Sequence, residues 1–159
     1  MDKKTFMEHM LAGEGTLYRT ACALLSSEED RRDALQETAL RAWQRRDTLR
    51  EEKFFTTWVT RILINVCHGM YRRQKRWVLT EQVEPGKYVP TVDAELRMML
   101  ETLPEKLRLP LWLFYLEGFS IAELAQTLGV PEGTVKYRLH QARKALKVEL
   151  TEESEVRHA

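Results

Sequence analysis

The strongest chemical signal in the sequence is a cationic segment near its C-terminal end. Between Lys136 and Lys147 the chain carries five Lys or Arg residues and no acidic residue. Such side chains bind phosphate groups, and the phenol, imidazole and amide groups among them can contact base edges in a DNA major groove. A basic helix that is merely solvated is the alternative, and the spacing of the preceding residues argues against it.

That spacing predicts a helix-turn-helix in which the cationic segment is the second helix. Ser120 suits a helix N-cap, with Glu123 three positions later. Gly129 supplies the turn, and Pro131 suits the first turn of the next helix. Two apolar stripes of helical period would be buried: Ile121, Leu124, Ala125 and Leu128, then Val135, Leu139, Ala142 and Leu146. The second helix would then present an outer face to DNA, made of Gly133, Lys136, Tyr137, His140, Gln141 and Lys144.

A second cationic segment lies in the first half of the chain. No acidic residue occurs between positions 61 and 78, where the basic residues are Arg61, Arg72, Arg73, Lys75 and Arg76. The helical period places an aromatic ring among cations on one face, made of Trp58, Arg61, Asn65, His68 and Arg72. Rings and guanidinium planes accept unstacked bases while the charges hold phosphates, which suits opened DNA. Trp58 fits the hydrophobic core equally well, and the sequence leaves both roles open.

The segment Asp33–Gln44 indicates a protein-docking surface. Its outward face mixes polar groups with one exposed leucine: Asp33, Gln36, Glu37, Leu40, Arg41 and Gln44. A helix whose polar face also presents an aliphatic anchor is typical of docking on another protein. Taken alone, the segment fits a solvated surface better, and the base-binding face of the following helix reverses that preference.

Composition and motifs exclude several classes of protein. The 159 residues are 43% apolar with a formal net charge of +1, and no apolar run approaches the roughly 18 residues of a membrane span. No export signal opens the chain, so we expect a cytoplasmic, nucleoid-associated protein without membrane insertion. Cys22 and Cys67 lack metal-ligand spacing and should be buried free thiols. No catalytic motif occurs, so we expect a non-enzyme without cofactor or metal.

The apolar pattern predicts an all-α protein with two small helical domains. In the first half, three stripes of helical period lie at 17–25, 35–43 and 55–70, and strand-like alternation is absent. The second half adds two supporting helices, the second of which begins at Pro104, contains Pro110 and ends near Gly118.

The breakers Pro85, Gly86 and Pro90 mark the connection between the halves. We therefore divide the chain into a first domain, a flexible linker, a second domain and a charged, frayed tail. Their ranges are 1–76, 77–94, 95–150 and 151–159.

Three segments in this order resemble bacterial RNA polymerase sigma factors of the sigma-70 family, extracytoplasmic-function (ECF, group 4) type. The segment DALQETALRAW resembles the part that binds core polymerase, and FFTTWVTRILINVCHGMYRRQKR resembles the adjoining promoter-melting part. The segment LPEKLRLPLWLFYLEGFSIAELAQTLGVPEGTVKYRLHQARKAL resembles the C-terminal promoter-binding domain. The resemblance implies sigma region 2 in the first domain, sigma region 4 in the second, and a transcription initiation factor that directs core polymerase to promoters.

The resemblance also implies roles for individual residues. The beta-prime clamp helices of polymerase would be met by Asp33, Gln36, Glu37, Leu40 and Arg41. The loop at 50–55 would receive a flipped minus-10 base, and the opened DNA would be held by Phe54, Trp58, Arg61, Asn65, Arg72 and Arg73. The minus-35 element would be bound by Thr134, Lys136, Tyr137, Arg138, His140, Gln141 and Lys144. The second domain would also meet the beta flap, and an anti-sigma factor would hold the protein inactive.

Three positions depart from the pattern of the family. Ala39 stands where Phe is frequent, Gly69 where Asp is common, and Tyr137 where a small Ser is common. The phenol of Tyr137 reaches farther than a hydroxymethyl group and stacks on a thymine methyl, so it could change the preferred upstream sequence.

Two other classes of protein remain as alternatives. A stand-alone dimeric helix-turn-helix regulator would bind paired half-sites without polymerase. A DNA recombinase would need an activated Ser or Tyr nucleophile with clustered Arg, which the first half does not offer.

Overall fold

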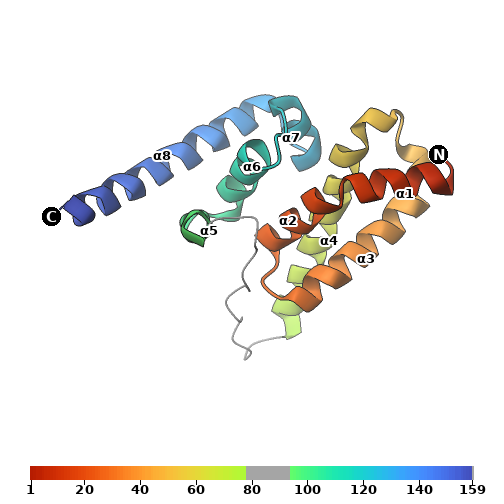
Figure 1. Cartoon of the computed structure of the whole chain (residues 1–159), viewed down its shortest axis with the longest axis horizontal. Coiled ribbons are helices and arrows are strands. Elements are labelled where there is room, and N and C mark those ends of the chain that lie inside the picture. Colours follow the sequence, from red (N-terminus) through yellow and green to blue (C-terminus); the bar gives the residue numbers. More distant parts are fainter. Residues whose placement is uncertain (78–93, 159) are drawn as a thin grey trace. The chain divides into compact units, whose positions relative to one another are not determined.

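The computed structural model describes residues 1–77 and 94–158, with the side chains of residues 1–70, 72 and 98–147. All regular secondary structure in these ranges is helical, so the predicted all-α fold class is confirmed (Figure 1). The chain divides into two compact units, Met1–Lys87 and Tyr88–Ala159. Most of the expected linker, residues 78–93, lies outside the described residues.

The described part of the first unit contains helices α1 (Lys3–Ala12), α2 (Glu14–Leu24), α3 (Glu28–Gln44) and α4 (Phe55–Trp77). Two short 3-10 helices, η1 (Arg46–Thr48) and η2 (Glu52–Phe54), connect α3 to α4. Helices α2, α3 and α4 pack against one another in pairs. Their common core includes Leu17, Ala21, Ala34, Ala42, Val59, Leu63 and Val66.

Helix α1 is not among the elements that the sequence predicts. Phe6 is its one deeply buried residue, so the helix lacks the repeated apolar stripe that marks an amphipathic helix. The Asp2 side chain caps it by accepting a hydrogen bond from the Thr5 amide at 2.8 Å. The Phe6 ring packs edge-on against Trp43 and Phe55, at centroid distances of 5.2 and 5.8 Å. These contacts join α1 to the end of α3 and to the start of α4.

Helix α3 buries its predicted stripe together with two polar residues. Of the stripe of Leu35, Ala39, Ala42 and Trp43, Ala42 is fully buried and Leu35 and Trp43 pack against the core, while Arg31, Ala34 and Thr38 are also deeply buried. The Thr38 hydroxyl donates to the Ala34 carbonyl at 2.6 Å, and Arg31 Nε donates to the Leu25 carbonyl at 3.0 Å. Because these hydrogen bonds offset the cost of burying polar groups, two polar residues take core positions that an apolar pattern does not reveal.

Glu28 links α2 to the first turn of α3. The Tyr18 hydroxyl donates to Glu28 Oε2 at 2.8 Å, and Arg31 lies 3.4 Å from the same oxygen. The hydrogen bond from Tyr18 lowers the pKa of the Glu28 carboxyl, and it raises the pKa of Tyr18. The N-terminal end of α3 is therefore held by polar contacts that complement the apolar core.

The described part of the second unit contains helices α5 (Ala94–Glu101), α6 (Glu105–Tyr115), α7 (Ile121–Leu128) and α8 (Glu132–His158). Helix α8 packs against α5, α6 and α7. Pro110 lies inside α6, as predicted, and is buried. Gly118, which has a φ of 72°, follows α6 and allows the chain to turn toward α7.

The end of the chain differs from the expected frayed tail. Helix α8 continues through residues 151–158. No Gly or Pro follows Gly133, so nothing in the sequence after that point breaks a helix.

Cys22 and Cys67 are buried and are not joined in a disulfide, as expected. Among the described helices, none combines the length and the apolar character needed to cross a membrane.

Candidate nucleic-acid and polymerase interfaces

Helices α7 and α8 form the predicted helix-turn-helix, and local contacts define its turn. The Ser120 hydroxyl accepts from the Glu123 amide, and the Glu123 carboxylate accepts from the Ser120 amide, each at 3.1 Å. This reciprocal capping box fixes the start of α7. Gly129 adopts the left-handed conformation, with φ 67° and ψ 36°. The Pro131 carbonyl accepts from the Thr134 amide at 3.0 Å, so the proline directly precedes α8.

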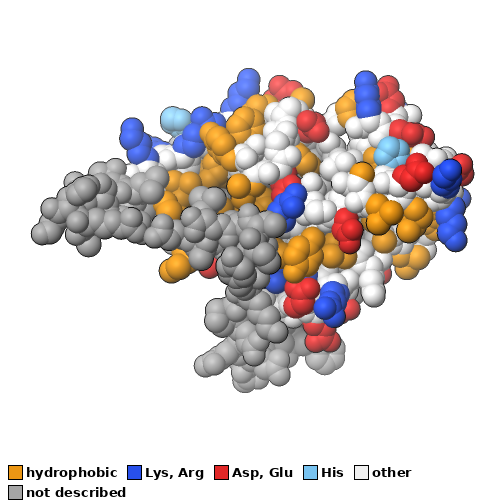
Figure 2. Space-filling model, viewed as in Figure 1, with side chains coloured by type: hydrophobic (Ala, Val, Ile, Leu, Met, Phe, Trp, Pro, Cys, Tyr) orange, Lys and Arg blue, Asp and Glu red, His pale blue; other side chains and the backbone are white. Residues whose placement is uncertain are grey.

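The two faces of α8 divide as the sequence predicts. Val135, Leu139 and Ala142 are fully buried, as is Leu124 of α7. On the outer face, here called the α8 face, Lys136, Tyr137, His140 and Lys144 are exposed, and Thr134, Arg138 and Gln141 are half-buried. Figure 2 shows Lys and Arg side chains gathered along the described part of this helix. The α8 face therefore combines cations with groups that can hydrogen-bond to base edges.

Helix α4 carries the second candidate DNA face, here called the α4 face. Its exposed members are Arg61, Asn65 and Arg72. Trp58 is half-buried, with its ring 5.6 Å from the Phe55 ring and its body packed against the core. One side of Trp58 thus packs in the core while its remaining surface is accessible. The position of the ring is therefore compatible with both expected roles, core packing and the binding of unstacked bases. Arg73 belongs to α4, but its side chain lies outside the described ones.

Helix η2, just before α4, exposes the Phe54 ring beside the ammonium group of Lys53. Phe54 is 39% exposed, and Lys53 Nζ lies 5.0 Å from its ring centroid. Lys53 also pairs with Glu51 at 3.2 Å. A ring accompanied by a cation can stack a base that has left the duplex. Phe55, only 2% exposed, anchors this segment in the core.

His9 also belongs to this region, although no sequence motif marks it. Its ring stacks on Phe55 at a centroid distance of 5.0 Å and an interplanar angle of 22°. Its Nε2 lies 3.3 Å from Glu52 Oε2. His9 and Glu52 are 43 positions apart, so no local spacing could have revealed the contact.

The candidate docking surface on α3, here called the α3 face, is exposed around one apolar anchor. Leu40 is 52% exposed and contributes nothing to the hydrophobic core. Arg41 Nε donates to Glu37 Oε1 at 2.8 Å, and Asp33 and Gln36 are exposed on the same helix. An exposed ion pair of this kind contributes little to stability, so these groups can exchange partners at low cost.

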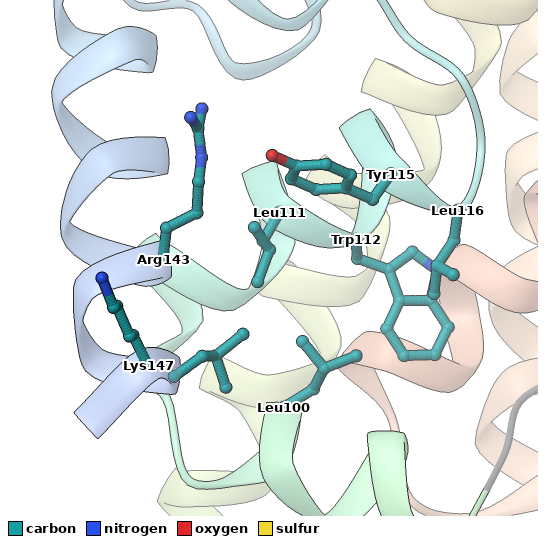
Figure 3. Close-up of a pocket in the computed structure, with 8 residues that line it drawn as sticks. Leu100, Leu111, Trp112, Tyr115, Leu116, Arg143 and Lys147 are labelled. Carbon is teal, nitrogen blue, oxygen red and sulfur yellow. The ribbon is translucent and has the colours of Figure 1, made fainter. Parts of the chain in front are cut away.

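The second unit also contains an apolar pocket between α5, α6 and α8, here called the α6–α8 pocket (Figure 3). Its volume is about 320 Å³. Its walls are Leu100, Leu111, Trp112, Tyr115, Leu116 and Leu146, with Arg143 and Lys147 at the rim. Trp112 Nε1 is buried without a hydrogen-bond partner among the described residues. No local sequence pattern marks this pocket, because it is formed only when three helices pack together.

The helix-turn-helix with a basic outer face defines a DNA-binding protein, and the α4 face adds a surface suited to opened strands. Within the described ranges, no three His, Cys, Asp or Glu side chains are grouped so that they could hold a metal ion.

Comparison with known proteins identifies the family. Residues 12–77 match the family described as Sigma-70 region 2, and residues 93–146 match the family described as Sigma-70, region 4. The chain is 35% identical over 136 residues to the ECF RNA polymerase sigma factor SigM of Mycobacterium tuberculosis, spanning 82% of this chain and 69% of that protein. It is 29% identical over 141 residues to the RNA polymerase sigma factor SigV of Bacillus subtilis, spanning 86% and 85% of the two chains.

A solved structure agrees with this family. The sigma factor RpoE from Bartonella quintana, in complex with the anti-sigma factor NepR, matches with a TM-score of 0.78 and 26% identity. The match covers 93% of this chain and 98% of that one.

The chain therefore belongs to the sigma-70 family of RNA polymerase sigma factors, as an ECF-type member with regions 2 and 4. It directs RNA polymerase to promoters and is a non-enzymatic transcription factor. The resemblance drawn from the three sequence segments is confirmed. This result favours the sigma factor over the stand-alone regulator and the recombinase.

Proposed function

We propose that this sigma factor uses the α3 face to bind core polymerase, the α4 face and the preceding segment to open the minus-10 element, and the α8 face to bind the minus-35 element. Region 2 would occupy residues 1–76 and region 4 residues 95–150, joined by the linker at 77–94. The observation that carries the proposal is the outer face of α8, where exposed Lys136, Tyr137 and His140 stand opposite a fully buried stripe.

DNA opening would be driven by capture of unstacked bases. Separating bases costs a few kcal/mol per step, and stacking on a protein ring returns about 1–3 kcal/mol per base. The half-buried Trp58 and the exposed Phe54 supply rings, while Arg61 and Arg72 supply phosphate contacts. Two small units joined by a linker add their contacts effectively only when the polymerase holds them at the correct separation.

Two surfaces would contact polymerase, the α3 face and the α6–α8 pocket. The α3 face, with Leu40 as its anchor, would meet the beta-prime clamp helices. The α6–α8 pocket has apolar walls and a cationic rim, so it fits an amphipathic segment with acidic groups at its edge. We assign this pocket to the beta flap.

Regulation would depend on an anti-sigma factor. The matched RpoE structure contains the anti-sigma factor NepR. By analogy, an anti-sigma partner of this chain would cover its polymerase-binding surfaces. The protein would act at chromosomal promoters in the cytoplasm.

A transcription assay tests the proposed function. Core polymerase and the purified protein together should yield promoter-specific transcripts, and neither should do so alone. The protein alone should give no stable gel shift, because its two DNA contacts are not yet held together. A stable shift on paired half-sites about one helical turn apart, without polymerase, would support the dimeric regulator instead.

Arg72→Ala tests the α4 face through its salt dependence. We expect the log–log slope of promoter affinity against salt to become shallower by about one unit, the value for one lost phosphate contact. The slope would be measured with holoenzyme, using Lys4→Ala as the control, since Lys4 is an exposed cation on α1. Equal slopes for both variants would remove Arg72 from the DNA interface.

A further inference from the structure

The segment that carries Phe54 is short and has little internal support. Helix η2 is a single 3-10 turn, in which the Phe54 amide donates to the Glu51 carbonyl at 3.1 Å. Such turns have poorer hydrogen-bond geometry than α-helices and rarely extend. The direction of the exposed Phe54 ring therefore depends on contacts made by the residues around it.

Helix α1 supplies such contacts at both ends of this turn. His9 contacts the Glu52 carboxylate, which opens η2, and stacks on Phe55, which follows it. The residues between Glu52 and Phe55 are Lys53 and Phe54, the cation and ring proposed to accept a minus-10 base. One side chain from α1 thus touches the residues on both sides of the proposed base-binding pair.

The contacts of His9 also affect Trp58 indirectly, through Phe55. The Phe55 ring, on which His9 stacks, lies 5.6 Å from the Trp58 ring. Phe6, three positions before His9, also packs against Phe55. Phe6 is 4% exposed and belongs to the core, whereas the His9 side chain is 31% exposed and that of Glu52 is 59% exposed. A polar contact between partly exposed side chains contributes little to folding stability, so the contact of His9 with Glu52 can be removed without unfolding the core.

We propose that His9 is a positioning residue for minus-10 recognition. It fixes the ends of η2, and thereby the direction of the Phe54 ring and the cation above it, without touching DNA itself. The inference rests on the proposed role of this segment in DNA opening.

Three variants in holoenzyme test this inference. His9→Ala removes the hydrogen bond and the stacked ring, His9→Phe keeps a ring, and Glu8→Ala is the control, because Glu8 is an exposed neighbour on α1. We expect His9→Ala to slow promoter opening about five-fold and to reduce discrimination among minus-10 bases, as an aromatic contact and an exposed hydrogen bond are lost together. His9→Phe should restore part of the loss, while core affinity and minus-35 preference stay unchanged in every variant.

Phe54→Ala distinguishes a failure of the positioning role of His9 from a failure of the proposed role of the Phe54 segment in DNA opening. If Phe54→Ala impairs opening while His9→Ala behaves like Glu8→Ala, the positioning role of His9 is wrong and the proposed function stands. If His9→Ala lowers core affinity, minus-35 preference and opening by the same factor, its role is structural and the inference is also overturned. If Phe54→Ala leaves opening and minus-10 discrimination unchanged, the proposed role of the segment fails, and the inference fails with it.

Discussion

Leu40→Asp is expected to weaken binding of this sigma factor to core polymerase by about 30- to 100-fold, the effect of losing an interface hot spot. Leu40 is 52% exposed on α3 and packs against nothing in the core. An aspartate there would place a charge where the interface needs an apolar contact, and burying an unpaired charge is costly. Affinity would be measured by titrating labelled sigma factor with core polymerase.

Leu11→Asp is the matched control for this prediction. Leu11 lies on α1 and is 65% exposed, so it also presents an apolar side chain to solvent. The free energy of unfolding should change little in either variant, since neither leucine is buried. Equal losses of polymerase affinity in the two variants would indicate a general effect of charge, and the α3 face would lose its assigned role.

Leu139→Ala is expected to destabilise the second unit by about 3 kcal/mol, within the range for truncating a fully buried leucine. Leu139 is 0% exposed and lies in the buried stripe of α8. The cavity would loosen the packing of α8 against its neighbours and so disturb the α8 face. Minus-35 binding should therefore weaken without loss of any DNA-contacting side chain.

Amide hydrogen exchange on the full chain provides the measurement. Exchange in α7 and α8 should accelerate by about 100-fold, whereas exchange in α4 should stay unchanged, because α4 belongs to a separate core. Leu139→Met is the control, since it keeps the side-chain volume and should cost less than about 1.5 kcal/mol. Unchanged protection of α8 in Leu139→Ala would contradict the assigned packing.

The helix-turn-helix could be predicted from the sequence because its determinants are local. The capping pair Ser120 and Glu123, the left-handed Gly129 and the buried stripes each depend on residues that are only a few positions apart. Each leaves a short-range pattern that helical geometry can interpret.

Features that depend on distant contacts could not be predicted in this way. Helix α1 has one core residue, and its partners Trp43 and Phe55 are more than 35 positions away. Arg31 and Thr38 take core positions on α3 that an apolar pattern does not reveal, because each donates a hydrogen bond to a main-chain carbonyl. The outward faces of α3 and α4 could be predicted from helical spacing, whereas their assignment to polymerase and to the minus-10 element came from the resemblance to a known family.

Given the proposed role of the α8 face, the short-range construction of the helix-turn-helix would make promoter choice exchangeable between relatives. The capping bonds at the start of α7 join only Ser120 and Glu123, and Gly118, which has a φ of 72° and no atom within 4 Å of where a Cβ would lie, marks a natural crossover point. A chimera that takes everything after this glycine from another member of the family would inherit that member's upstream preference. It would keep the strand-opening machinery of this one, so new promoter specificities could be assembled by recombination.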